Sequence, residues 1–192
     1  MAIKALIFDN FGVLMDLVYS SLRHVLPEEA RARLLDILDR ADNGRISDTE
    51  ELRQIEVLLD EYNLDGAKSV AKAIQNADRN TKLLDFIRAN RDKYKMAMLS
   101  NVSAVIWNYY TQQQLDEYFD EVVLSYREGV AKPDQRIYEL TCERLGVQPP
   151  ECVFADDNEV NVVAARQVGM HGIVFTGNED YFKQLQEIID NA

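Results

Sequence analysis

The sequence predicts an α/β protein with a doubly wound parallel sheet and a small helical insertion. Short apolar runs end abruptly in polar residues, a pattern typical of parallel strands that are buried on both faces. Segments with helical spacing separate most of these runs, and strands that alternate with helices form parallel sheets covered on both sides. Residues 17–80 break this alternation, because helix follows helix there without a convincing strand.

Five runs are expected to be strands, at residues 3–8, 96–100, 122–125, 152–156 and 172–175. The first is typical, since Ile3–Phe8 is almost continuously apolar and Asp9 follows at once. Apolar residues at helical spacing predict core helices over 83–87, 137–145 and 160–168. Gly146 and Gly169 follow the last two segments, as glycine commonly does at the C-terminus of a helix.

Residues 17–80 are expected to form a helical cap inserted into the core. Its helices are predicted over 27–40, from 47 or 48 to about 62, and over 67–77. Pro27 suits the first turn of a helix, Asp42–Gly44 is a turn sequence, and Ser47 or Asp48 can cap the helix that follows. We therefore assign residues 1–16 and 81–192 to the α/β core and residues 17–80 to the cap.

Composition excludes several classes of function. The chain has 192 residues, a formal net charge of −12 and a pI near 4.6. This charge would repel nucleic acid and anionic membrane surfaces, so neither is an expected partner. No apolar run is long enough to cross a bilayer, and the N-terminus lacks the pattern of a signal peptide, so we expect a cytoplasmic protein. Two cysteines are too few for a disulfide framework.

Polar residues at the expected strand ends carry the functional information, since ligands bind at the carboxyl ends of parallel strands. These residues are Asp9, Ser100 and Asn101, Lys132 in a loop, and Asp156, Asp157 and Asn158. Three carboxylates in one place would repel one another unless a divalent cation neutralised them, and oxygen ligands of this kind suit Mg²⁺. A hydroxyl, main-chain amides and an ammonium group beside them suit a phosphoryl group.

Each of these features has a structural interpretation as well. Asp9, the Ser100–Asn101 pair and the Asp156–Asn158 cluster could simply cap the helices that follow. Lys132 could be an exposed loop charge. Four such features in the expected order favour the functional interpretation.

The motifs resemble those of the haloacid dehalogenase superfamily, which implies a Rossmann-like core. The matching segments are Ile7–Leu14, Leu99–Asn101, Lys132–Asp134 with Ile137–Tyr138, and Phe154–Asn158 with Asn161. They are most similar to the glucose-1-phosphatase-like and epoxide-hydrolase N-terminal-like branch, where a Gly-x-Ile-Ser/Thr element such as Gly44–Ser47 recurs in the cap. The resemblance implies a Mg²⁺-dependent hydrolase that acts on small phosphate esters. We favour sugar phosphates, although the sequence names no substrate and leaves the oligomeric state open.

The resemblance also implies roles for individual residues. Asp9 would be the nucleophile that becomes an aspartyl-phosphate, and Lys132 would steady both this carboxylate and the phosphate. Ser100 and Asn101 would bind the phosphate, and Arg45 would contact the substrate. Asp9, Asp157 and the carbonyl of Phe11 would bind the metal ion. Asp156 would act on the metal through water or from behind the direct ligands.

Phe11 departs from the phosphatase pattern, which has there an aspartate that protonates the leaving oxygen. Losing a general acid typically costs a factor of about 10²–10⁴, so we expect a substitute, for which Asp16 is the candidate. The 2-haloacid dehalogenases resemble the chain in carrying an aromatic residue at this position, and a halide needs no proton. However, Asp156 and Asp157 would repel a carboxylate substrate, which favours the phosphatase. A degenerate member that binds without turnover is the third alternative.

Overall fold

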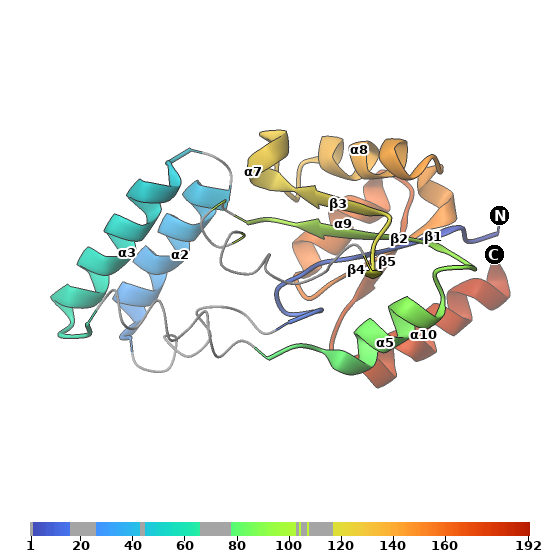
Figure 1. Ribbon diagram of the computed structural model, residues 1–192, viewed down its shortest axis with the longest axis horizontal. Coiled ribbons are helices and arrows are strands. Elements are labelled where there is room, and N and C mark those ends of the chain that lie inside the picture. The colour runs from blue at the N-terminus through green and yellow to red at the C-terminus, as the bar shows by residue number, and fades with distance from the viewer. Residues whose placement is uncertain are drawn as a thin grey trace.

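The computed structural model describes residues 2–15, 26–42, 45–65, 78–102, 104, 107 and 117–192. Its strands are β1 (Ala5–Phe8), β2 (Lys95–Ser100), β3 (Glu121–Leu124), β4 (Cys152–Asp156) and β5 (His171–Val174). All neighbouring pairs are parallel, in the order β3-β2-β1-β4-β5, with β1 at the centre (Figure 1). The predicted α/β class and the five predicted strands are confirmed, each strand to within about one residue at its ends, apart from the first, which begins at Ala5.

Helices cover both faces of the sheet, as expected for a doubly wound fold. The helices α5 (Thr81–Ala89) and α10 (Asn178–Asn191) pack on the face that carries Leu6, Phe8 and Met98. On the other face, α8 (Gln135–Leu145) and α9 (Glu159–Gln167) pack over Ile7 and the neighbouring strands. The short elements α7 (Ser125–Glu128) and η2 (Pro149–Glu151) connect strands to helices. The helix α10 was not predicted from the sequence.

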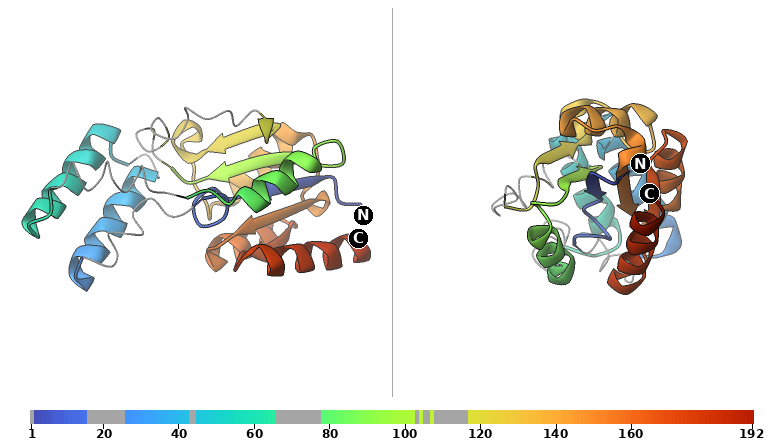
Figure 2. Two further views of the ribbon diagram at one scale, coloured as in Figure 1. Left: turned by 60° about the horizontal axis from the view of Figure 1, so that its bottom comes forward. Right: turned by 90° about the vertical axis from the view of Figure 1, so that its right-hand side faces the viewer.

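The insertion contains α2 (Glu28–Asp42) and α3 (Asp48–Glu61), which pack against each other. Ser47 caps α3 as predicted, because its side chain accepts a hydrogen bond from the amide of Glu50. Both helices lie beyond the carboxyl ends of the strands, at the opposite end of the protein from the two termini (Figures 1 and 2). The helix predicted over 67–77 lies outside the described residues. The division into a core of residues 1–16 and 81–192 and a cap of residues 17–80 stays a prediction.

The insertion is tied to the core where the chain leaves and re-enters it. Met15 and Arg79 form an antiparallel bridge, and the amide of Asn80 donates to the carbonyl of Leu14 at 2.9 Å. The Asn80 side chain also donates to the carbonyl of Val13 at 2.9 Å and caps α5. The two connections are therefore bonded to each other directly after the loop that follows β1. Among the described residues, no helix is both long and apolar enough to span a bilayer.

Candidate active site

The two central strands bring Asp9 and Asp156 together at the carboxyl edge of the sheet. Phe8 in β1 is in register with Ala155 in β4, so the next residue on each strand is one of these aspartates. Both carboxyl groups are buried, Asp156 completely. Burial of two carboxylates side by side is unfavourable without a counter-charge.

Lys132 supplies that counter-charge from the loop before α8. Its Nζ lies 2.7 Å from Oδ1 of Asp9 and 2.7 Å from Oδ2 of Asp156, and its side chain is 1% exposed. Asn101, just after β2, holds the main chain of this lysine on both sides. The asparagine Nδ2 donates to the carbonyl of Lys132 at 2.8 Å, and its Oδ1 accepts from the amide of Lys132 at 2.9 Å. The lysine is thus an interior residue and not an exposed loop charge.

Asp156 is held by donors on both of its carboxylate oxygens. Oδ1 accepts from the amide of Asn158 at 2.8 Å, and Asn161 Nδ2 lies 3.2 Å from Oδ1 and 3.0 Å from Oδ2. Oδ2 also accepts from Lys132. This carboxylate therefore fixes the start of α9 and the lysine ammonium group at the same time. A metal ion bound directly to it would compete with these hydrogen bonds.

The carboxyl group of Asp9 lies in a strongly perturbed environment. The pKa of this group is raised to about 7, chiefly by burial and also by the charge of Asp156, while the charge of Lys132 acts to lower it. Burial alone would lower the pKa of Lys132, but the two carboxylates raise it overall. Oδ1 of Asp9 accepts from the lysine and from the amide of Asn10 at 2.7 Å. A cation placed near this group would favour its ionised form.

Asp157 forms a group of three carboxylates with Asp9 and Asp156. Each residue offers one oxygen to this group, and the three oxygens lie within 4.8 Å of one another. Gly12 makes room for it, because a Cβ there would lie 2.5 Å from both Cγ and Oδ2 of Asp157. Gly12 also has a φ of +90°, which favours glycine. An oxygen-only donor set of this size fits Mg²⁺. Gly12 was not predicted to belong to the site, although a glycine three residues after the strand-end aspartate is a signal that the sequence contains.

The other predicted site residues have different surroundings. Ser100 is fully buried at the end of β2, with its Oγ 3.5 Å from the carbonyl of Asn101. Phe11 is half-buried and packs against the core, so its side chain is a core contact. Arg45 is exposed and forms an ion pair with Asp39 at 3.6 Å. Asp16 lies outside the described residues.

Comparison with known proteins gives several full-length similarities. The D-ribitol-5-phosphate phosphatase of Bacteroides thetaiotaomicron is 24% identical over 98% of the chain and 100% of that protein. The phosphorylated carbohydrates phosphatase of Thermotoga maritima is 26% identical over 92% of the chain and 88% of that protein. The (S)-2-haloacid dehalogenase 4A of Burkholderia cepacia is 24% identical over 90% of the chain and 82% of that protein. By contrast, the chain spans 7% of mouse acyl-CoA dehydrogenase family member 10, with 41% identity over 71 residues.

Among solved structures, a HAD family enzyme from Bacteroides thetaiotaomicron in complex with magnesium and inorganic phosphate has a TM-score of 0.76 and 25% identity. The similarity covers 95% of this chain and 99% of that one. The family model for haloacid dehalogenase-like hydrolases matches residues 3–169, which include Asp9, Lys132 and all three carboxylates of the cluster. The chain therefore belongs to the haloacid dehalogenase-like hydrolase family.

Proposed function

We propose that the protein is a Mg²⁺-dependent phosphatase of small phosphate esters that forms an aspartyl-phosphate on Asp9. The charge balance of the site is the observation that carries this proposal. Asp9, Asp156 and Asp157 gather three carboxylates, and two of these share the ammonium group of Lys132. A divalent cation would balance the negative charge of such a cluster, and a phosphate ester is the substrate class that a metal ion and an ammonium group together would attract.

Asp9 and Asp157 would hold the Mg²⁺ directly, with the main-chain carbonyl of Phe11 as a further ligand. Asp156 would act through water or by positioning, because its oxygens already accept hydrogen bonds from Lys132, Asn158 and Asn161. When bound, the ion would supply positive charge that neutralises the carboxylates and the phosphate oxygens. The close fit of Gly12 against Asp157 supports this assignment, since it leaves space only for a residue without a side chain.

In the proposed reaction, an oxygen of Asp9 attacks phosphorus while the bond to the leaving oxygen breaks. Lys132 stabilises the developing negative charge, and Ser100 with the amides around Asn101 holds the phosphate. Water then attacks the aspartyl-phosphate, which releases inorganic phosphate and restores Asp9.

The leaving oxygen needs a proton unless it departs as a stable anion. Phe11 cannot supply this proton, because its side chain is apolar and packs on the core. We retain Asp16 as the candidate acid. The substrate class that we favour is sugar and polyol phosphates, on the strength of the two phosphatase relatives, with the insertion of residues 17–80 and its Arg45 contributing to selectivity.

The test is an assay of phosphate release from a panel of esters, with Mg²⁺ and with excess EDTA. Asp9→Asn should abolish turnover without unfolding the protein, since the amide is nearly isosteric but a poor nucleophile. Asp134→Asn is the matched control, because Asp134 is an exposed cap of α8 that asparagine can replace. Rapid acid quenching should reveal wild-type protein that carries one phosphoryl group. Wild-type activity in EDTA, or in Asp9→Asn, would exclude the proposal.

Phe11 favours one second candidate, a 2-haloacid dehalogenase, because halide release needs no proton. The similarity to the (S)-2-haloacid dehalogenase 4A of Burkholderia cepacia is compatible with a dehalogenase. In this reaction Asp9 would displace the halide and form an ester that water cleaves. Chloride release from 2-chloropropionate without Mg²⁺, and no phosphate release from any ester, would establish this alternative. Binding of phosphate esters with neither product would instead identify a member of the family that has lost turnover.

A further inference from the structure

Arg79 stands apart from the other arginines of the part of the chain that the structure describes. Each of the others takes part in a hydrogen bond, an ion pair or another electrostatic contact. The guanidinium of Arg79 has no such partner within the described residues, although the residue is half-buried. An anionic ligand at this guanidinium could therefore gain charge-assisted hydrogen bonds without displacing a protein partner among the described residues.

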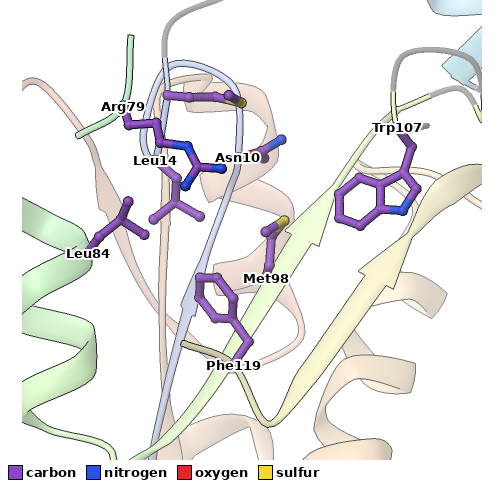
Figure 3. Close-up of a pocket in the computed structure, with 8 residues that line it drawn as sticks. Asn10, Leu14, Arg79, Leu84, Met98, Trp107 and Phe119 are labelled. Atoms are coloured by element: carbon purple, nitrogen blue, oxygen red, sulfur yellow. The ribbon is translucent and has the colours of Figure 1, made fainter. Parts of the chain in front are cut away.

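This side chain points into a pocket at the carboxyl edge of the sheet (Figure 3). The pocket has a free volume of about 30 Å³. Its walls are mostly apolar and come from the loop after β1, from Arg79 and α5, from β2 and from the segments that follow β2. They are formed by Asn10, Leu14, Met15, Arg79, Leu84, Met98, Trp107 and Phe119. A charge-assisted hydrogen bond inside such walls would be stronger than one in water.

The pocket adjoins the proposed nucleophile. Asn10 lines it, and the amide of the same residue donates to Oδ1 of Asp9 at 2.7 Å. The position of Arg79 relative to this loop is fixed by its bridge with Met15 and by the hydrogen bonds of the next residue, Asn80, to the loop. A substrate whose phosphate lies at Asp9 would therefore have its organic part within reach of a guanidinium at a defined place.

We propose that Arg79 binds a carboxylate in the organic part of the substrate. This inference rests on the proposed phosphatase function and narrows its substrate class to those sugar, polyol and other small phosphate esters that also carry a carboxylate, such as phosphorylated sugar acids. A planar carboxylate matches the fork of N–H donors on a guanidinium. It is also smaller than a second phosphoryl group and so suits a small pocket, with a volume of about 30 Å³, better.

Two phosphate esters that differ in this group make the test: D-3-phosphoglycerate, which has a carboxylate, and glycerol 3-phosphate, which has a hydroxymethyl group instead. Their dissociation constants are measured by calorimetry at one fixed concentration of free Mg²⁺. Trp107 is the single tryptophan of the chain and lines the pocket, so its fluorescence reports occupancy there. The variants are Arg79→Gln, Arg79→Lys and, as a control for lost charge, Lys82→Gln on the nearby helix α5.

Wild type should bind the carboxylate probe about tenfold or more tightly than the hydroxymethyl probe, with a change in Trp107 fluorescence. Arg79→Gln should remove this preference, Arg79→Lys should restore part of it, and Lys82→Gln should keep it. Equal binding of both probes by wild type would overturn the inference. So would equal weakening of both by Arg79→Gln, the same loss in Lys82→Gln, or binding that leaves Trp107 fluorescence unchanged. A carboxylate preference without hydrolysis would uphold Arg79 and refute the phosphatase.

Discussion

Gly12→Ala perturbs the proposed metal site without removing any ligand. The added Cβ would lie 2.5 Å from Cγ and Oδ2 of Asp157 and 2.9 Å from its Oδ1. Ordinary contacts between such atoms start near 3.4 Å. The carboxylate of Asp157 would therefore have to move by roughly 1 Å, or the loop after β1 would have to move away from it.

The substitution destabilises the protein in two ways, through backbone strain at Gly12 and through the contact with Asp157. The control Gly129→Ala measures the backbone strain alone. The φ of +90° at Gly12 imposes a conformational penalty of about 1–2 kcal/mol on any other residue. Gly129 has a φ of +67°, and a Cβ at that position would have nothing within 4 Å, so Gly129→Ala should show a similar penalty alone. The contact with Asp157 should add about 1–3 kcal/mol to the cost at Gly12 if the loop stays in place. If the carboxylate moves instead, metal affinity should fall by about 10–100-fold.

The assays are denaturant unfolding in EDTA and calorimetric titration with Mg²⁺. Gly129→Ala should lose stability but keep its Mg²⁺ affinity. In an Asp157→Ala background, Gly12→Ala should cost no more than Gly129→Ala, because the group that it collides with is gone. If Gly12→Ala matched Gly129→Ala in stability and kept wild-type Mg²⁺ affinity, either Asp157 would not be a ligand or its position would not matter.

Two further predictions concern the nucleophile loop. The folded-state pKa of Asp9 lies near 7, above its ordinary value of 3.8, so the metal-free protein binds this proton more tightly when folded. The free energy of unfolding of the metal-free protein should therefore fall by about 1–4 kcal/mol as the pH rises from about 4 to about 7, because Asp9 ionises over this range in the unfolded protein but stays protonated in the folded one. Unfolding at several pH values in EDTA should show this slope in wild type and not in Asp9→Asn; parallel curves would contradict it. Second, if no other group protonates the leaving oxygen, p-nitrophenyl phosphate should turn over much faster than glycerol 3-phosphate, and Phe11→Asp should narrow the gap. Equal rates for both esters in wild type, with Asp16→Asn selectively slowing the second, would show that Asp16 already provides the proton.

The sheet and the strand-end residues were predictable because both depend on local sequence. A buried parallel strand needs a short continuous apolar run, and the residue after it must lie at the carboxyl edge. Asp9 and Asp156 follow from that rule alone. The helix α10 was missed although Tyr181 and Leu185 have helical spacing, because no strand follows it to continue the alternation. For the cap, local signals predicted α2 and α3, including the Ser47 cap, but not how the insertion meets the core.

The finer geometry of the site depends on contacts between residues that are far apart in the chain, and no local pattern encodes those. Asn101 was expected to hold phosphate, yet its side chain makes two hydrogen bonds to the main chain of Lys132, 31 residues away. Arg79 carried no signal in the sequence, because its significance lies in a missing partner among the described residues and in a pocket formed by segments that are far apart in the chain. Gly12 gains its significance only from the approach of Asp157.

The connections of the insertion bear on how substrate recognition and chemistry depend on each other. The loop after β1 is a tight turn in which the amides of Leu14 and Met15 donate to the carbonyl of Asn10. The amide of Asn10 in turn donates to Asp9, while Met15 pairs with Arg79. A continuous set of hydrogen bonds thus joins the proposed nucleophile to the proposed carboxylate-binding residue. These bonds are mostly between main-chain atoms, so the position of Arg79 relative to Asp9 depends on this loop and little on the helices of the insertion. A substrate bound by Arg79 would therefore be positioned directly with respect to the nucleophile.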